Sequence, residues 1–126
     1  MAHGLLTAAA LWGALGVAFG AFGAHALEDL VRPERLATFT TGVQYQLVHA
    51  LAAAIAATVA AQIRGARLAG GLLLTGSLLF SGSLYALVAT DLGLFGAVAP
   101  LGGAGMIAGW LVLARAGWHA GRLSAR

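Results

Sequence analysis

The sequence predicts an all-α integral membrane protein that crosses the bilayer four times. Of its 126 residues, 60% are hydrophobic and only 9% are charged, whereas soluble domains average about 25% charged residues. A soluble chain this short would have too little polar surface to cover itself. We therefore expect residues 1–126 to form a single membrane domain, built as a four-transmembrane-helix bundle.

Four charge-free runs are long enough to span a membrane, which takes about 20 predominantly apolar residues. They predict spans at about residues 5–27, 43–63, 68–90 and 93–114. Strict alternation is absent and Ala and Leu are abundant, so helices are favoured over barrel strands. The first run contains Ala24-His25-Ala26, which resembles a signal-peptidase site. It lacks a basic n-region and exceeds the usual apolar length of about 7–15 residues, so we interpret it as a span.

The connection between the first two spans contains an amphipathic stretch. Pro33 suits the first turn of a helix, where its missing N–H has no intrahelical partner. Leu36, Phe39 and Val43 then recur at i, i+3 and i+7. We interpret residues 33–42 as a short amphipathic interfacial segment that runs into the second span. The alternative is that the second helix simply protrudes into water.

The arginines predict the orientation. With four spans, both termini lie on one side of the membrane. That side carries five arginines: Arg64, Arg67, Arg115, Arg122 and Arg126. The other side carries only Arg32 and Arg35, together with all four acidic residues. The positive-inside rule then predicts that both termini lie in the cytoplasm.

Two spans carry faces of glycine. Small residues let membrane helices approach closely, and close packing drives helix association in lipid. The helix-packing glycines predicted from their spacings of three and four residues are Gly13, Gly16, Gly20, Gly23, Gly102, Gly105 and Gly109. Packing within one bundle is the simpler interpretation, and dimerisation through one such face is the alternative.

A few polar side chains lie inside or at the ends of the spans, where they are costly unless paired and often mark function. Helix counting places them in the outer half of the membrane. The candidate polar pocket consists of His25, Gln46, His49, Ser81, Ser83 and Tyr85. In one hypothesis these groups satisfy one another and hold the helices together. In the other they line an outward-facing cavity for a small polar molecule, a proton or a lipid headgroup.

Other chemistries find little support in the sequence. There is no cysteine, and two histidines on different helices lack a third ligand, so we expect no metal and no cofactor. No nucleophile elbow, phosphate loop or intramembrane carboxylate pair predicts an enzyme. The arginines form no basic face with interleaved aromatics, so nucleic acid is not expected as a partner. We interpret Trp12, Trp110 and Trp118 as interfacial or packing aromatics.

Four motifs carry a family resemblance. They are GAFGAH at residues 20–25, TGVQYQ at 41–46 followed by His49-Ala50, LFSGSLY at 79–85, and PLGG at 100–103 with Ala108-Gly109-Trp110. Their order resembles domain of unknown function 423, whose eukaryotic members are called transmembrane protein 256. The resemblance covers about residues 5–114 and implies a small four-span inner-membrane protein without an assigned activity.

Two functions remain open from the sequence. The first is a structural or accessory membrane protein, or a subunit of a membrane complex, with the bilayer, other membrane proteins or a second copy as partners. The second is a binding or transport protein that uses the outward-facing pocket. A filled cavity between the polar side chains would favour the second.

Overall fold

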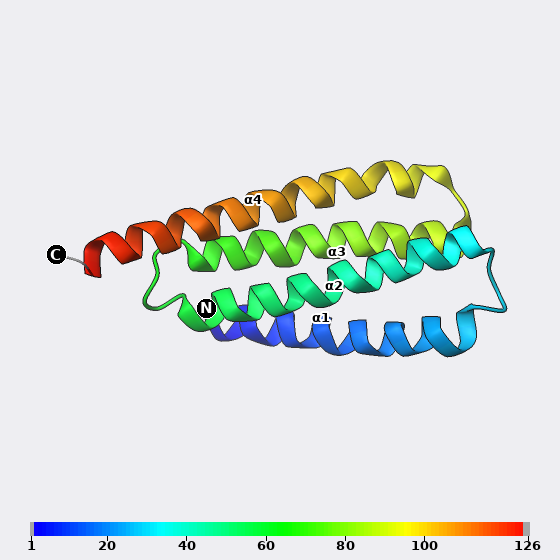
Figure 1. Cartoon of the computed structure of the whole chain (residues 1–126), viewed down its shortest axis with the longest axis horizontal. Coiled ribbons are helices and arrows are strands. Elements are labelled where there is room, and N and C mark those ends of the chain that lie inside the picture. The colour runs from blue at the N-terminus through cyan, green and yellow to red at the C-terminus, as the bar shows by residue number, and fades with distance from the viewer. Residues whose placement is uncertain (1, 125–126) are drawn as a thin grey trace.

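The computed structural model describes residues 2–124 and is made of long helices (Figure 1). They are α1 (Ala2–Phe22), continued by the π-helical turn η1 (Gly23–Leu27), then α2 (Pro33–Val59), α3 (Ala66–Thr90) and α4 (Gly93–Ser124). Each of the four helical segments is long and apolar enough to cross a membrane. The predicted all-α, four-span class is therefore confirmed, and no strand occurs in residues 2–124.

The helices pack in the order in which they follow one another along the chain. α1 lies against α2, α2 against α3, and α3 against α4, with α1 and α4 on the two sides of the bundle (Figure 1). Consequently about half of the most apolar part of α2 is buried, and nearly as much of α3, whereas α1 and α4 expose most of their surface. The two outer helices therefore present the largest area to lipid.

The amphipathic segment forms the first turns of α2 without a break. Arg32 is extended, as expected for a residue before proline, and Pro33 starts the helix. Phe39 and Val43 are buried, and with Leu27 they form a cluster to which Leu36 is added. The apolar face of residues 33–42 thus packs against the bundle itself.

Two left-handed residues close the short connections. Gly65, with φ of 95°, precedes α3, and Asp91, with φ of 55°, ends it. A positive φ suits glycine, and aspartate is among the few other residues that tolerate it. The Asp91 N–H donates to the Leu87 carbonyl at 2.8 Å, which closes the last turn of α3.

Two helix ends differ from the predicted spans. α2 stops at Val59, and turns carry the chain from there to α3. α4 continues to Ser124, about ten residues beyond the predicted span, and its last turns project past the other helices (Figure 1). Trp118 and Leu123 on this extension are exposed. Hydropathy locates the apolar stretch, but it does not limit a helix that continues into a polar sequence.

The glycines of α4 allow backbone contact with α3. A Cβ built at Gly102 would lie 2.4 Å from the Phe80 nitrogen, and one at Gly109 would lie 2.9 Å from the Leu73 nitrogen. On the α3 side, a Cβ at Gly76 would lie 2.7 Å from the Met106 nitrogen. Any side chain at these positions would push the two helices apart, so the close packing of α3 and α4 depends on glycine.

The glycines of α1 and the first residue of η1, Gly23, face α2. A Cβ at Gly16 would meet the side chains of Gln46 and Leu47, at Gly20 that of Val43, and at Gly23 that of Phe39. Gly13 is looser, because its nearest neighbour would be the Ala50 Cβ at 3.6 Å. Both predicted glycine faces therefore lie against helices of the same chain.

We predict that Gly102→Ala lowers stability by about 1–3 kcal/mol, because the new methyl meets backbone atoms that cannot rotate away. Gly103→Ala is the matched control, since a Cβ there has nothing within 4 Å. Unfolding of both variants in detergent micelles measures the difference in their free energies of unfolding. Equal stability of the two variants would contradict the backbone contact between α3 and α4.

Candidate functional site

A buried glutamine lies at the centre of the polar side chains. Gln46 is at the midpoint of α2 and has no exposed surface. Its Nε2 donates to the backbone carbonyl of Trp12 on α1 at 2.8 Å. Its Oε1 accepts a hydrogen bond from the Tyr85 hydroxyl of α3 at 2.5 Å. One side chain therefore connects three helices.

Two glycines make room for these contacts. Gly16 lies one turn after Trp12, and a Cβ there would come within 3.2 Å of the Gln46 side chain. Gly42 lies one turn before Gln46, and a Cβ there would come within 2.8 Å of the Tyr85 ring. Replacing either glycine would push on the glutamine or on its phenol partner.

Two serines of α3 extend the network. The Ser81 hydroxyl donates to the Gly42 carbonyl at 2.7 Å, which joins α3 to α2. The Ser77 hydroxyl donates to the Leu74 carbonyl within its own helix and accepts the indole N–H of Trp12 at 3.0 Å, which joins α3 to α1. Both serines are fully buried. Each hydroxyl thus has hydrogen-bond partners inside the protein, which lipid cannot provide.

His49 connects α2 to α4. Its Nδ1 lies 2.8 Å from the Tyr45 carbonyl, and its Nε2 lies 3.2 Å from the indole nitrogen of Trp110. A carbonyl only accepts and an indole N–H only donates, so the pattern assigns the proton to Nδ1 and leaves Nε2 as an acceptor.

The six residues of the predicted pocket do not form one pocket. Gln46 and Tyr85 bond to each other. Ser81 and His49 each make a separate bond to another helix. Ser83 donates to the Phe80 carbonyl of its own helix. His25 lies exposed on η1 and makes no hydrogen bond to the described part of the chain.

The network lies near the middle of α2 and of α3. Gln46 lies at the midpoint of α2, and Ser77 lies one residue from the midpoint of α3. Helix counting predicts that the polar residues lie in the outer half of the membrane, and α2 is one helix from Pro33 onward. His49 is therefore about 24 Å along that helix.

The sequence singles out Trp12 and Trp110 only as interfacial or packing aromatics, and it does not single out Ser77. Tryptophans usually mark the membrane interface, whereas here both indoles donate a hydrogen bond to a side chain of another helix. The available signal is position, because Trp12 and Trp110 lie well inside their helices rather than at an end.

The network leaves no polar group unmet. Across residues 2–124, no buried side-chain nitrogen or oxygen lacks a hydrogen-bond partner. The same part of the chain contains no group of three or more histidine, aspartate or glutamate side chains placed to hold a metal ion. A ligand at Gln46 would therefore have to break an existing bond before making its own.

A cavity of about 290 Å³ opens at the other end of α1, beside η1. It is lined by Gly20, Gly23, Ala24, Glu28, Leu36, Phe39, Thr40 and Val43. Of the six predicted pocket residues, none lines it. Its polar lining groups are the exposed carboxylate of Glu28 and the hydroxyl of Thr40, which already donates to the Leu36 carbonyl.

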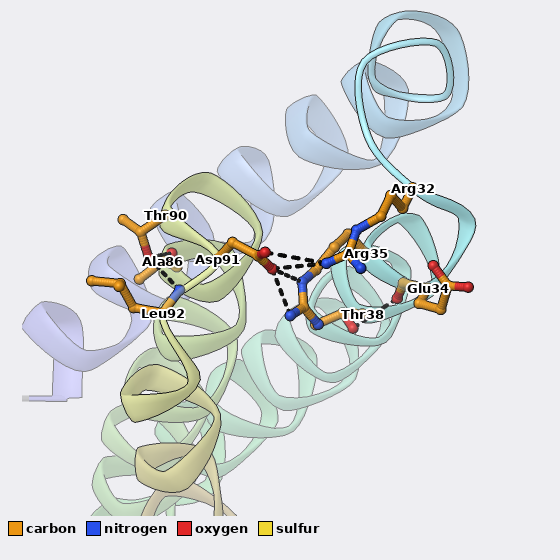
Figure 2. A network of polar contacts seen from close by, with 8 residues as sticks. All are labelled: Arg32, Glu34, Arg35, Thr38, Ala86, Thr90, Asp91 and Leu92. Atoms are coloured by element: carbon orange, nitrogen blue, oxygen red, sulfur yellow. Dashed lines mark hydrogen bonds and ion pairs between the residues drawn. The ribbon is translucent and has the colours of Figure 1, made fainter.

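Two ion pairs at this end join Asp91, in the connection after α3, to Arg32 before α2 and to Arg35 in the first turn of α2 (Figure 2). Asp91, after α3, accepts hydrogen bonds from Arg35 at 2.6 Å and from Arg32 at 3.1 Å. The hydrogen bond from Arg35, with the charges of both arginines, holds the pKa of Asp91 below its usual range. A lowered pKa means that this attraction is present at neutral pH and weakens as the pH falls below about 4.

These features define a class: a small polytopic membrane protein of four helices, held together by glycine contacts and an internally satisfied polar network. The family model described as a protein of unknown function (DUF423) matches residues 19–103. The chain belongs to this family, as the motifs predict.

Its relatives carry names that state a location but no activity. The UPF0382 membrane protein YwdK of Bacillus subtilis is 41% identical over 79% of this chain and 83% of its own length. A UPF0382 membrane protein of Haemophilus influenzae is 39% identical over 90% of this chain and 93% of its own. The UPF0382 inner membrane protein YgdD of Escherichia coli is 38% identical over 86% of this chain and 85% of its own length. No solved structure matches the chain.

We predict that Tyr85→Phe destabilises the bundle by about 1 kcal/mol, because it leaves the buried Gln46 oxygen without a donor. Tyr45→Phe is the matched control. The Tyr45 ring stacks on His49, but its hydroxyl makes no hydrogen bond to the described residues. Denaturant unfolding in micelles compares them, and a loss as large for Tyr45→Phe as for Tyr85→Phe would contradict the pairing.

Proposed function

We propose that the protein is an accessory component of the inner membrane that acts through lateral contacts with lipid and with other membrane proteins. The supporting observation is the paired state of its polar interior. Gln46, Ser81 and His49 each bond to a second helix, and no buried polar side-chain atom in residues 2–124 remains available for a substrate. A carrier of a polar substrate needs such groups along its path.

The outer surfaces of α1 and α4 support the same proposal. Leu11 and Val17 on α1, and Leu101 and Leu111 on α4, each expose about two thirds of their surface. These helices lie on the two sides of the bundle (Figure 1). Either surface offers an apolar helix face to a transmembrane helix of a partner.

A second candidate function rests on the cavity beside η1. Its carboxylate at Glu28 and its apolar wall at Phe39 suit a small molecule or lipid headgroup with a cationic group. π-helical turns are rare and occur frequently at functional sites, which adds support. In this version the protein binds at one end of the bundle and passes nothing through its centre.

We also propose that both termini face the cytoplasm. The support is the arginine distribution, with five arginines on the side of the termini and two on the other side. Arg32 and Arg35 are moreover engaged by Asp91, which reduces the net positive charge at their end.

One tagged protein tests role and orientation together. A tag after residue 126 should resist protease added to intact cells, and affinity purification from native membranes should recover a membrane protein in stoichiometric amount. Two variants then map the contact: Gly103→Trp on α4 and Gly82→Trp on α3, where an added Cβ has nothing within 4 Å. The variant that lowers recovery of the partner lies on the contact surface. Recovery of the bare chain from cross-linked native membranes would contradict the accessory role, and cleavage of the tag would contradict the orientation.

A further inference from the structure

A groove of about 590 Å³ runs along α3 at the end of the molecule that carries the termini. It is lined by Gly65, Arg67, Leu68, Gly71, Leu72 and Thr75. From Arg67 to Thr75 it follows the helix for about 12 Å. Its wall is apolar apart from the two ends, and Leu68 is 61% exposed, so the groove faces the lipid.

The charge around the mouth of this groove has one sign. Arg67 lines it, and Arg64 lies next to Gly65 in the same turn. Arg115 is at the same level, because a Cβ built at Gly65 would lie 3.4 Å from the Cβ of the neighbouring Ala116. All four acidic residues of the chain lie at the opposite end: Glu28, Asp29 and Asp91 in the connections, and Glu34 in the first turn of α2.

Backbone groups add to the positive potential at the mouth. Arg67 and Leu68 are in the first turn of α3, where N–H groups have no carbonyl within the helix to which they can donate. No side chain caps this turn. The end of a helix where such N–H groups point is favourable for a phosphate.

We propose that this groove binds a phospholipid with a net negative headgroup. The phosphate lies at Arg67 and the first turn of α3, and an acyl chain follows the apolar wall along Leu68, Gly71 and Leu72. A zwitterionic phospholipid also carries a phosphate, but it brings a cationic group towards Arg64 and Arg115. The arginines therefore select the anionic lipid. This inference does not depend on the accessory role proposed above.

Gly71 provides a way to close the groove without disturbing the fold. A Cβ there has nothing within 4 Å, so Gly71→Leu projects into the groove rather than into a neighbouring helix. Gly82→Leu is the matched control. It makes the same change on the same helix, eleven residues or about three turns further on, where a Cβ also has nothing within 4 Å.

The measurement is native mass spectrometry of protein released from nanodiscs that contain equal amounts of phosphatidylglycerol and phosphatidylcholine. We expect wild type and Gly82→Leu to retain one phosphatidylglycerol in preference to phosphatidylcholine, and Gly71→Leu to lose this retention. Equal retention by Gly71→Leu and Gly82→Leu, or equal retention of both lipids by wild type, would overturn the proposal.

A second pair of variants separates the site from general attraction. Arg67→Gln removes a charge in the groove, and Arg122→Gln removes one on the projecting part of α4, outside it. We expect the first change to lower phosphatidylglycerol retention by about fivefold and the second to leave it within twofold, from the effect of one arginine near an anionic surface. Equal losses in the two variants would show a diffuse attraction and overturn the site.

Discussion

The structure depends on one constraint, the need to satisfy a carboxamide buried in the middle of a membrane protein. Lipid offers Gln46 no hydrogen-bond partner, so both ends of its amide must find one in the protein. The partners are the Trp12 carbonyl on α1 and the Tyr85 hydroxyl on α3. Because both lie on other helices, satisfying the amide fixes the rotation and the depth of α2 relative to its neighbours.

The glycines follow from the same constraint. Gly16 and Gly42 leave the space that Gln46 and the Tyr85 ring occupy. α4 is held differently, by backbone contact over Gly102 and by the Trp110–His49 bond. Since lipid is as apolar as leucine, such contacts and hydrogen bonds take the place that hydrophobic burial has in a soluble core.

The sequence predicts the four helices well and the site only in part. Charge-free runs of spanning length must satisfy their backbone hydrogen bonds within the segment, which an α-helix does, so the fold class follows directly. Gln46, His49, Ser81 and Tyr85 are recognisable as polar residues within spans. Their acceptors are largely backbone carbonyls, such as those of Trp12 and Gly42, which no composition reveals. His25 resembles these residues in the sequence, because it is a polar residue at the end of a span, yet it lies exposed on η1.

The buried polar side chains of residues 2–124 are all paired, and the interior that they form is closed to water. Because the chain contains no cysteine, a single cysteine reports accessibility without background. The most direct measurement is labelling by a hydrophilic maleimide in nanodiscs, which expose both faces of the membrane. Ser81→Cys, at a buried position, should stay unlabelled while Asp29→Cys, in the exposed connection after η1, reacts to completion. Labelling of Ser81→Cys at a rate comparable to that of Asp29→Cys would reveal a water-filled pocket and contradict a closed polar interior.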